Sequence, residues 1–238
     1  MMRPLLILAG GFGTRLSSVV QDVPKPLAPV CGSPFLRYIL INCIEQGVKD
    51  IVLLLHYKAE QFEEVIREFQ DAECFADVRI QSVIESKPLG TGGSVRHAVN
   101  KLDSFDSFMV INADTWLGEG LRDLNKSGSN SLLAVSVTDC SRYGSLGIKD
   151  GRVKEFKEKK SSKYPGWINA GAYCLTSDVF AKYQADEYIS MELDVLPELV
   201  KESNLKVVKT NSNFIDIGIP EDYFKFCKWI ELGRNYDL

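Results

Sequence analysis

The first half of the chain alternates short apolar segments with amphipathic helical ones, and this alternation limits the fold more than any other feature. The expected strands are runs rich in Leu, Ile and Val: Leu5–Leu8, Ile51–Leu55, Met109–Ile111 and the more alternating Arg79–Ile84. The expected helices are Pro34–Gln46, Ala59–Gln70 and Ser94–Lys101, the first with Ser33 as N-cap, Pro34 at its first position and Gly47 as its stop. Apolar strands separated by such helices pair in parallel with both faces of the sheet covered, so we expect an α/β protein.

The second half changes character, with strands broken by Gly, Asp and Ser turns. The strands expected there are Leu132–Thr138, Gly147–Ile148, Val153–Phe156, Ala170–Leu175 and Lys206–Thr210, and helices return at Ser190–Ser203 and Pro220–Glu231. Asp150-Gly151 between two of these strands indicates a hairpin. No Pro/Gly/Ser-rich linker divides the chain, so we expect one domain over 1–238 with a mixed sheet. Residues 1–115 would bind a nucleotide and residues 116–238 a second ligand.

Composition excludes several classes of function. The 238 residues are 45% apolar and carry a formal net charge of −4, so no basic surface for nucleic acid or an anionic membrane is indicated. Six cysteines form no C-x-x-C pair and only two histidines accompany them, which disfavours structural zinc. The N-terminal apolar run is too short for a signal sequence, and no stretch is long enough to cross a membrane. We therefore expect a cytoplasmic protein; its oligomeric state is open, with a homo-oligomer among the states allowed.

A glycine-rich segment follows the first expected strand. Gly10-Gly11-Phe12-Gly13-Thr14-Arg15-Leu16 leaves the carboxyl end of that strand, where ligands of parallel sheets bind. Its backbone N–H groups could hold phosphate, Arg15 could bind phosphate oxygens bidentately, and Lys25 sits on a stiff segment between two prolines. The alternative is a tight turn with a solvated Arg15. The spacing fits neither the dinucleotide G-x-G-x-x-G loop nor the P-loop.

The motifs together resemble the sugar-phosphate nucleotidyltransferase family. The resemblance rests on Gly10 to Leu16, on Pro24-Lys25-Pro26-Leu27 and on Gly32-Ser33-Pro34-Phe35. It implies a Rossmann-like, GT-A-like domain with a mixed, mostly parallel central sheet. It further implies that Arg15, Lys25 and Asp114 are catalytic, and that the nucleotide is bound by Leu8, Gly10, Gly11, Gly13, Thr14, Arg15, Glu85, Gly90, Thr91 and Gly92.

The segment Pro88-Leu89-Gly90-Thr91-Gly92-Gly93-Ser94 precedes an expected helix. In the family, the matching loop faces the nucleotide base and contacts its edge through backbone atoms. Glu85, just before it, could accept hydrogen bonds from a base edge that carries N–H donors, and guanine offers two together. A solvated surface glutamate is the alternative.

Two aspartates match the metal-binding positions of the family. Asp114 follows the apolar strand Met109–Ile111, at a strand end where a Mg²⁺ ligand is expected, although an N-cap role is the alternative. Asp216 lies in Asp216-Ile217-Gly218-Ile219-Pro220-Glu221-Asp222, whose last two acidic residues are expected to cap the final helix. The family more often has Gly where Ala113 stands. Mg²⁺ is therefore the expected cofactor, held by Asp114 and Asp216.

The resemblance assigns the sugar phosphate to the second half and to the end of the strand before Asp114. Its ligands would be Asn112, Gly144, Glu158, Lys159, Asn169 and Gly171. Lys159 would take the phosphate and Glu158 the sugar hydroxyls, with Lys157 competing for the phosphate. Lys160 stands where the family commonly has Pro. The alternatives are a solvated charged loop and, for Asn169, a turn residue.

The expected reaction is nucleotidyl transfer from an NTP to a sugar 1-phosphate with release of pyrophosphate. The attacking phosphate is already an anion, so positioning and charge stabilisation suffice. The segments from Ile84 to Gly93, Arg142-Tyr143-Gly144 and Phe214 to Tyr223 look most like guanylyltransferases that act on D-glycero-α-D-manno-heptose 1-phosphate, which implies GTP as the NTP. Mannose, glucose or N-acetylmuramate 1-phosphate with UTP, dTTP or CTP are alternatives, and a catalytically silent nucleotide-sugar-binding regulator is a rival from another class.

Overall fold

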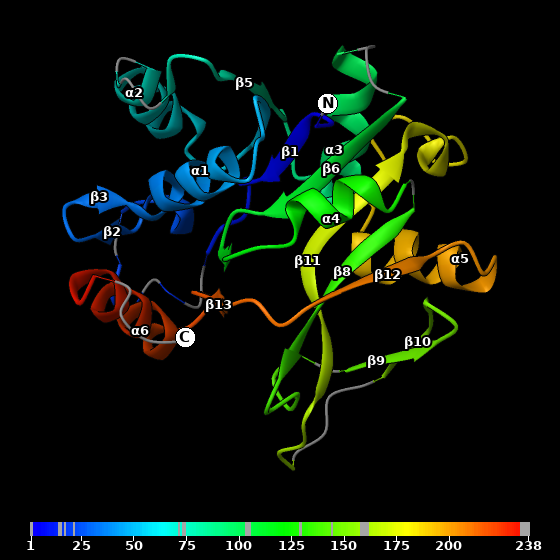
Figure 1. The fold of residues 1–238 in the computed structure, drawn as a ribbon. Coiled ribbons are helices and arrows are strands. Elements are labelled where there is room, and N and C mark those ends of the chain that lie inside the picture. Colours follow the sequence, from blue (N-terminus) through cyan, green and yellow to red (C-terminus); the bar gives the residue numbers. More distant parts are fainter. Residues whose placement is uncertain are drawn as a thin grey trace.

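A mixed sheet runs through both halves of the chain (Figure 1). The computed structural model describes residues 2–13, 16, 18–20, 22–70, 72, 75–102, 106–128, 130–143, 145–157 and 162–233. Within these residues nine strands lie side by side in the order β5-β4-β1-β6-β11-β8-β12-β10-β9. Their bounds are β1 Leu5–Leu8, β4 Asp50–Leu55, β5 Arg79–Ile84, β6 Ser107–Asn112, β8 Ser131–Val137, β9 Ser145–Lys149, β10 Arg152–Lys157, β11 Gly166–Thr176 and β12 Lys206–Thr210.

The first four strands of that order are parallel, as the apolar alternation predicts. β1 pairs with β4 on one side and with β6 on the other, and β4 pairs with β5. Side chains along a strand point to alternate faces, so Leu5 and Ile7 enter one core and Leu6 enters the other. Helices α1 (Phe35–Glu45), α2 (Ala59–Gln70), α4 (Leu121–Lys126) and α6 (Pro220–Glu231) pack on the first face, and α3 (Gly90–Leu102) and α5 (Leu196–Lys201) on the second. The predicted α/β class is confirmed.

The second half extends this sheet with strands of both directions. β11 is antiparallel to β6 and β8, β12 is parallel to β8, and the β9–β10 hairpin closes the edge. The predicted hairpin turn at Asp150-Gly151 is confirmed, and both residues have positive φ, 54° and 69°. A two-stranded ribbon of β7 (Thr115–Leu117) and β13 (Phe214–Asp216) lies beyond β6, and β2 (Pro29–Val30) pairs with β3 (Ser33–Pro34).

Two predicted helix starts are wrong. Helix α1 begins at Phe35 without a side-chain cap, because Ser33 and Pro34 belong to β3 and the carbonyl of Ala28 accepts from the Phe35 N–H. Gly47, with φ 96°, does follow its end. Helix α3 begins at Gly90 rather than Ser94, because the carbonyl of Ile189 accepts from the N–H groups of Gly92 and Gly93.

The predicted helix Ser190–Ser203 is divided. A π-helical turn over Met191–Val195 precedes α5, and the Ser190 hydroxyl caps it by accepting from the Leu193 N–H. The helical periodicity is therefore interrupted where this segment meets the start of α3.

Candidate active site

A pocket of about 340 Å³ lies at the carboxyl ends of the four parallel strands. Each of β1, β4, β5 and β6 delivers the residues that follow it, as expected for a ligand site in a parallel sheet. The volume is in the range of small-molecule sites. Its lining residues are Leu8, Ala9, Gly10, Gly11, Phe12, Gly13, Lys25, Pro26, His56, Glu85, Pro88, Leu89, Gly90, Thr91, Ser94, Asn112, Asp114 and Tyr188.

The glycine segment forms one wall of this pocket. Gly10 passes close to the next strand end, where a Cβ would lie 3.1 Å from the backbone nitrogen of His56, and Gly11 faces open space. Gly13 packs on Lys25, with 3.0 Å between the Lys25 Cβ and the position a Cβ would take on Gly13. The predicted phosphate ligands Thr14 and Arg15 lie outside the described residues.

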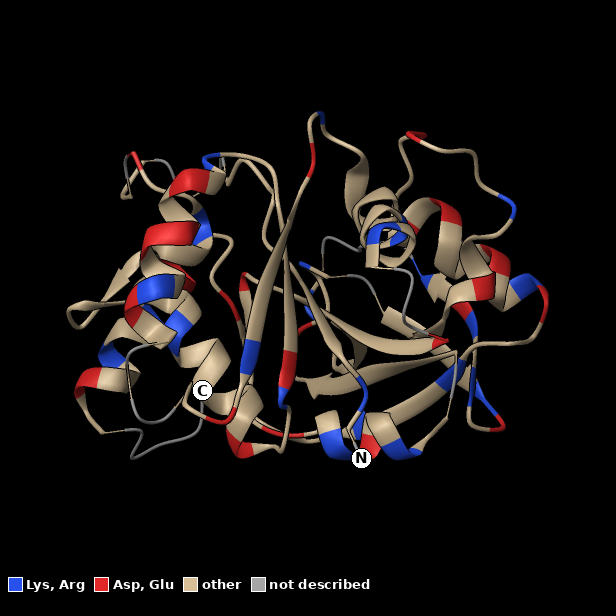
Figure 2. Cartoon of the chain, turned by 90° about the horizontal axis from the view of Figure 1, so that it is seen from above, with Lys and Arg blue, Asp and Glu red and all other residues tan. Residues whose placement is uncertain are grey.

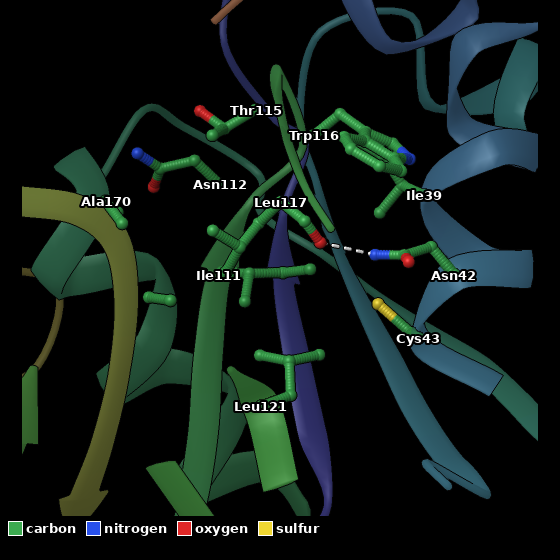
Figure 3. Close-up of a pocket in the computed structure, with 12 residues that line it drawn as sticks. Ile39, Asn42, Cys43, Ile111, Asn112, Thr115, Trp116, Leu117, Leu121 and Ala170 are labelled. Atoms are coloured by element: carbon green, nitrogen blue, oxygen red, sulfur yellow. Dashed lines mark hydrogen bonds between the residues drawn. The ribbon is translucent and has the colours of Figure 1, made fainter. Parts of the chain in front are cut away.

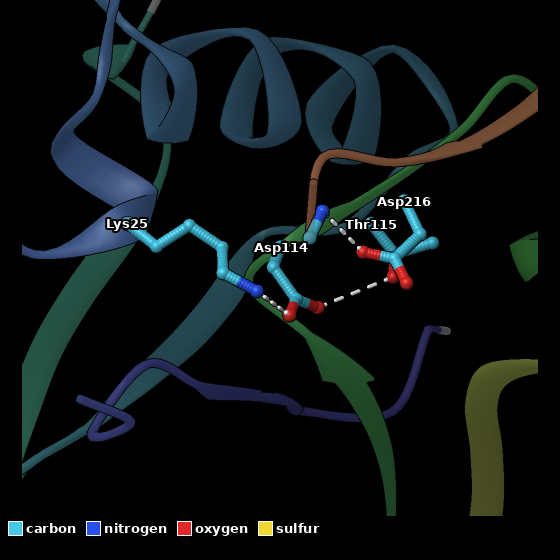
Figure 4. Close-up of polar contacts among 5 residues, drawn as sticks. Lys25, Asp114, Thr115 and Asp216 are labelled. Atoms are coloured by element: carbon cyan, nitrogen blue, oxygen red, sulfur yellow. Dashed lines mark hydrogen bonds and ion pairs between the residues drawn. The ribbon is translucent and has the colours of Figure 1, made fainter. Parts of the chain in front are cut away.

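Lys25 is held at the pocket by an ion pair. It lies in the 3₁₀ turn Lys25–Leu27, only 9% exposed, and its Nζ is 2.7 Å from Asp114 Oδ2. Figure 4 shows the ammonium reaching the carboxylate at the end of β6. Lys25 is buried and Asp114 is partly exposed, so the ion pair orients the ammonium at the pocket without a ligand.

The two predicted metal carboxylates come together at the β7–β13 ribbon (Figure 4). Asp216 pairs with Thr115, the residue after Asp114, and the Ile217 N–H donates to the Asp114 carbonyl. Asp114 Oδ1 accepts from the Thr115 hydroxyl, and Asp216 Oδ1 accepts from the Gly218 N–H at 2.7 Å. Among the described residues no group of three or more Cys, His, Asp or Glu side chains could hold a metal, so any ion here would have two protein carboxylates.

The helix that follows Asp216 begins as predicted at Pro220, with Glu221 and Asp222 in its first turn. Asp222 also forms an ion pair with Arg142, 2.6 Å between Oδ2 and Nη2. This contact connects α6 to the segment after β8, near the metal carboxylates.

Glu85 is buried rather than solvated. It is 5% exposed at the end of β5, and its Oε2 accepts from the Leu89 N–H at 3.1 Å. No described residue donates a hydrogen bond to its buried Oε1. A buried carboxylate oxygen without a donor is costly, so its place in the lining of a ligand pocket indicates that a ligand supplies the donor.

The predicted base loop is the first turn of α3, and much of it contacts protein. The Thr91 hydroxyl donates to Glu192 and accepts from the Met191 N–H, and the Gly92 N–H donates to the Ile189 carbonyl. Gly90 and Thr91 still line the pocket, whereas Gly92 does not. The Gly92 backbone N–H is therefore not available to a base edge.

Of the predicted sugar-phosphate residues that can be placed, Asn169 and Gly171 lie at a bulge in β11 and Asn112 ends the neighbouring β6. The β11–β8 register shifts between Asn169 and Tyr173, and Asn169 Oδ1 accepts from the Gly171 N–H while its Nδ2 donates to the Tyr173 hydroxyl. Gly171 has φ 68°, and a Cβ there would lie 2.5 Å from the side-chain nitrogen of Asn112. Bulges of this kind re-aim side chains next to ligand sites.

Asn112 lines both the main pocket and a smaller apolar cavity of about 20 Å³, shown in Figure 3. In that view Asn112 and Ala170 come from neighbouring strands, and Asn42 of α1 donates to the Leu117 carbonyl. Gly144, Glu158 and Lys159 lie outside the described residues. Lys157 is exposed at the end of β10 and pairs with Glu155 at 3.4 Å.

Comparison with known proteins places the chain in a family. Residues 5–231 match the nucleotidyl transferase family. The chain belongs to this family. It is 36% identical over 222 residues to the D-glycero-alpha-D-manno-heptose 1-phosphate guanylyltransferase of Campylobacter jejuni, covering 93% of this chain and 97% of the relative. It is 33% identical to the enzyme of that name from Aneurinibacillus thermoaerophilus, covering 95% and 97%.

A solved structure of HddC from Yersinia pseudotuberculosis complexed with GMP-PN is similar to this chain over nearly its whole length. Its TM-score is 0.83 at 37% identity, with 96% of this chain and 100% of that chain covered. These findings make the protein a sugar-1-phosphate nucleotidyltransferase, as the motifs predict. A mannose-1-phosphate guanylyltransferase of Mycobacterium tuberculosis is 32% identical, and the match spans 62% of that longer relative.

The surface charges of this nucleotidyltransferase are mixed. Figure 2 shows Lys and Arg alternating with Asp and Glu along the helices, without a continuous basic stretch in that view. With a net charge of −4, binding of anionic substrates must rest on local cations such as Lys25. No helix among the described residues is long and apolar enough to span a membrane.

Several lining residues of the nucleotidyltransferase pocket were not among the predicted site residues, and His56 and Tyr188 are two with polar side chains. His56 follows β4, and its Nδ1 lies 3.1 Å from the Glu85 carbonyl oxygen. The argument that found Asp114, a polar residue directly after a buried strand, would have found it too. Tyr188 comes from the segment before the π-helical turn, and no local pattern marks it.

Proposed function

We propose that the protein is a guanylyltransferase that joins GTP to D-glycero-α-D-manno-heptose 1-phosphate. The observation that carries the choice of GTP is Glu85, a buried carboxylate in the pocket whose Oε1 has no donor among the described residues. Guanine presents N1–H and the 2-amino group side by side, and these two donors match a carboxylate acceptor. Uracil, thymine and cytosine lack that pair of adjacent donors on one edge.

The relatives support the same assignment. Two proteins named heptose 1-phosphate guanylyltransferases match nearly their full length to this chain, and the Yersinia structure is a complex with GMP-PN. In the mannose-1-phosphate guanylyltransferase of Mycobacterium tuberculosis the match spans only 62% of the relative. Heptose 1-phosphate is therefore the favoured sugar and mannose 1-phosphate the comparison substrate.

The reaction follows from the charges in the pocket. An oxygen of the sugar phosphate forms a bond to the α-phosphorus of GTP while the bond from that phosphorus to the bridging oxygen breaks, so that GDP-sugar and pyrophosphate leave. Lys25 is already oriented by Asp114 and would place its ammonium against the phosphates as charge shifts to the leaving group. Arg15 and Lys159 would bind the pyrophosphate and the sugar phosphate.

The donor set at the β7–β13 ribbon fits Mg²⁺, which prefers carboxylate oxygens and keeps several waters. Asp114 and Asp216 would hold the ion, and each carboxylate oxygen has lone pairs beyond the hydrogen bonds described. When bound, Mg²⁺ would serve as a charge template for the phosphates of both substrates.

A matrix of nucleotides and sugars tests the proposal. Pyrophosphate release is measured for GTP, ATP, UTP, dTTP and CTP, each with heptose, mannose, glucose and N-acetylmuramate 1-phosphates, in Mg²⁺. We expect the highest kcat/KM for GTP with D-glycero-α-D-manno-heptose 1-phosphate. A higher value for any other base or sugar would refute that part of the assignment, and no release from any pair would refute catalysis.

A further inference from the structure

The second half of the chain contributes a strap to the base pocket. We define the strap as residues 188–191, which follow the 3₁₀ turn Ser177–Phe180 and end at the first residue of the π-helical turn. The Ile189 N–H donates to the Leu89 carbonyl at 2.8 Å, and the Ile189 carbonyl accepts from Gly92 and Gly93 at 2.8 and 3.1 Å. The Met191 N–H donates to the Thr91 hydroxyl at 2.8 Å. The strap is thus fixed to the first turn of α3 by backbone bonds.

The glycines of that turn make room for the strap. A Cβ on Gly90, whose φ is 76°, would lie 2.5 Å from the Ile189 oxygen and 3.1 Å from Cζ of Tyr188. A Cβ on Gly92 would lie 2.8 Å from an Ile189 methyl group. The exposed Tyr188 ring could turn aside, but the Ile189 backbone oxygen could not yield at 2.5 Å, so a side chain at Gly90 would displace the strap.

The Tyr188 side chain leaves the strap on the side of the pocket. It is 69% exposed, yet it lines the same pocket as Glu85, and its ring lies over Gly90 at the start of α3. Scattered exposed aromatics are normal and need no explanation. This one, like Phe12, lines the pocket that contains the buried Glu85 carboxylate, and it alone of the two is joined to Glu85 through Leu89 and the strap.

We propose that Tyr188 is a further nucleotide-binding residue, whose ring packs on the face of the guanine whose edge Glu85 binds. This inference rests on the proposed function. Leu89 connects the two groups: its N–H donates to Glu85 Oε2, and its carbonyl accepts from the Ile189 N–H next to Tyr188. The N–H of Leu89 therefore positions the Glu85 carboxylate, and its carbonyl positions the backbone next to the Tyr188 ring.

The two residues have different effects on base choice. A carboxylate distinguishes bases by their donors, whereas an aromatic ring stacks on any base because every base has a π face. Tyr188 therefore adds affinity for the nucleoside without adding preference for guanine. Inosine triphosphate, which lacks the 2-amino group, should lose as much from removal of Tyr188 as GTP does.

The test is calorimetric titration of the whole protein in Mg²⁺ with GTP, ITP, ATP, UTP and inorganic tripolyphosphate, the last of which has no base. Tyr188→Ala is compared with wild type, with Tyr188→Phe and with Leu193→Ala. Leu193 is a matched control because it is apolar, 79% exposed and close in sequence, and it is not among the residues that line the pocket. Melting temperatures without ligand report on folding, and they should change little because Tyr188 is exposed.

We expect Tyr188→Ala to weaken GTP and ITP about ten-fold, within the range for stacking of a base on an aromatic side chain, with tripolyphosphate unchanged. Tyr188→Phe should bind GTP within about two-fold of wild type, because the stacking face is retained. Equal GTP affinity in wild type and Tyr188→Ala would overturn the inference alone, as would an equal loss for tripolyphosphate. A wild-type protein that binds ATP or UTP more tightly than GTP would instead overturn the proposed base, and the inference with it.

Discussion

Replacement of Glu85 by glutamine is the sharpest test of base recognition. The side chain keeps its size, and its carbonyl oxygen can still accept from the Leu89 N–H, as Oε2 does at 3.1 Å. The change is at the position of Oε1, a buried oxygen without a donor among the described residues. In glutamine this oxygen is replaced by an amide NH₂ group, which donates. The amide would then face the donors of guanine.

The expected loss follows from the hydrogen bonds involved. A bond to a charged acceptor contributes about 1.5–3 kcal/mol, and a buried donor left unpaired costs about 1–3 kcal/mol. The glutamine side chain can rotate or bind a water molecule, which would restore part of the lost hydrogen-bond energy. We therefore expect a net loss of about 2–3 kcal/mol in binding free energy, which is roughly 30- to 150-fold in kcat/KM for GTP. The melting temperature should change little.

The assay is pyrophosphate release at saturating sugar phosphate with GTP or ITP varied. Wild type should prefer GTP, because ITP leaves part of the carboxylate unpaired, and Glu85→Gln should reduce that preference toward one. Glu64→Gln, on the exposed side of α2, removes the same charge outside the pocket and should leave both values unchanged. If Glu85→Gln keeps its kcat/KM for GTP within two-fold, or keeps the wild-type ratio of GTP to ITP, Glu85 does not read the base.

Three further outcomes follow from the geometry. Lys25→Ala should lower kcat by about 100-fold or more, the range for loss of a preorganised charge-stabilising group, with a smaller effect on unfolding in urea; full turnover would refute its role. Gly171→Ala should lower the free energy of unfolding more than Gly151→Ala does. Both glycines have φ near 70°, but only a Cβ at Gly171 would meet a side-chain amide. Equal midpoints of urea unfolding for the two variants would contradict the contact. Cys43 is buried, which raises its pKa to about 12, so iodoacetamide at pH 8 should modify exposed Cys31 in the native protein and Cys43 only after unfolding, as mass spectrometry of the peptides can check.

The parallel half of the fold was predictable from local sequence because each of its strands is short, apolar and bounded by an amphipathic helix. Ala59–Gln70 and Arg79–Ile84 are observed with the predicted bounds. Errors arose where a tertiary contact replaced a local signal. Ser33 has the chemistry of an N-cap, but strand pairing holds it in β3 and the Ala28 carbonyl accepts the N–H that begins α1.

Some site residues could likewise be predicted from local sequence, whereas others depend on tertiary contacts. Asp114 was proposed from its place just beyond an apolar strand together with the family motif, and Glu85 from its place before the predicted base loop. Both lie at the edge to which parallel strands bring their carboxyl ends. Asp216 was found only through a motif, since its approach to Asp114 depends on the β7–β13 pairing of two short strands far apart in the chain. No periodicity encodes a pairing of that kind.

The glycines at the start of α3 show why residue type alone gives an incomplete role. In sequence they suggest a backbone that faces a ligand, since glycine permits close approach. In the structure the close approach at Gly92 is made by Ile189, from a segment about a hundred residues later, and the Gly92 N–H donates to its carbonyl. The Gly92 N–H is therefore not available to a base at this pocket. On our proposals, the second carboxylate oxygen of Glu85 binds the edge of the base and the ring of Tyr188 packs on its face. Guanine selectivity would then depend on a side chain, and a glutamate-to-glutamine change could alter it without disturbing the glycine turn.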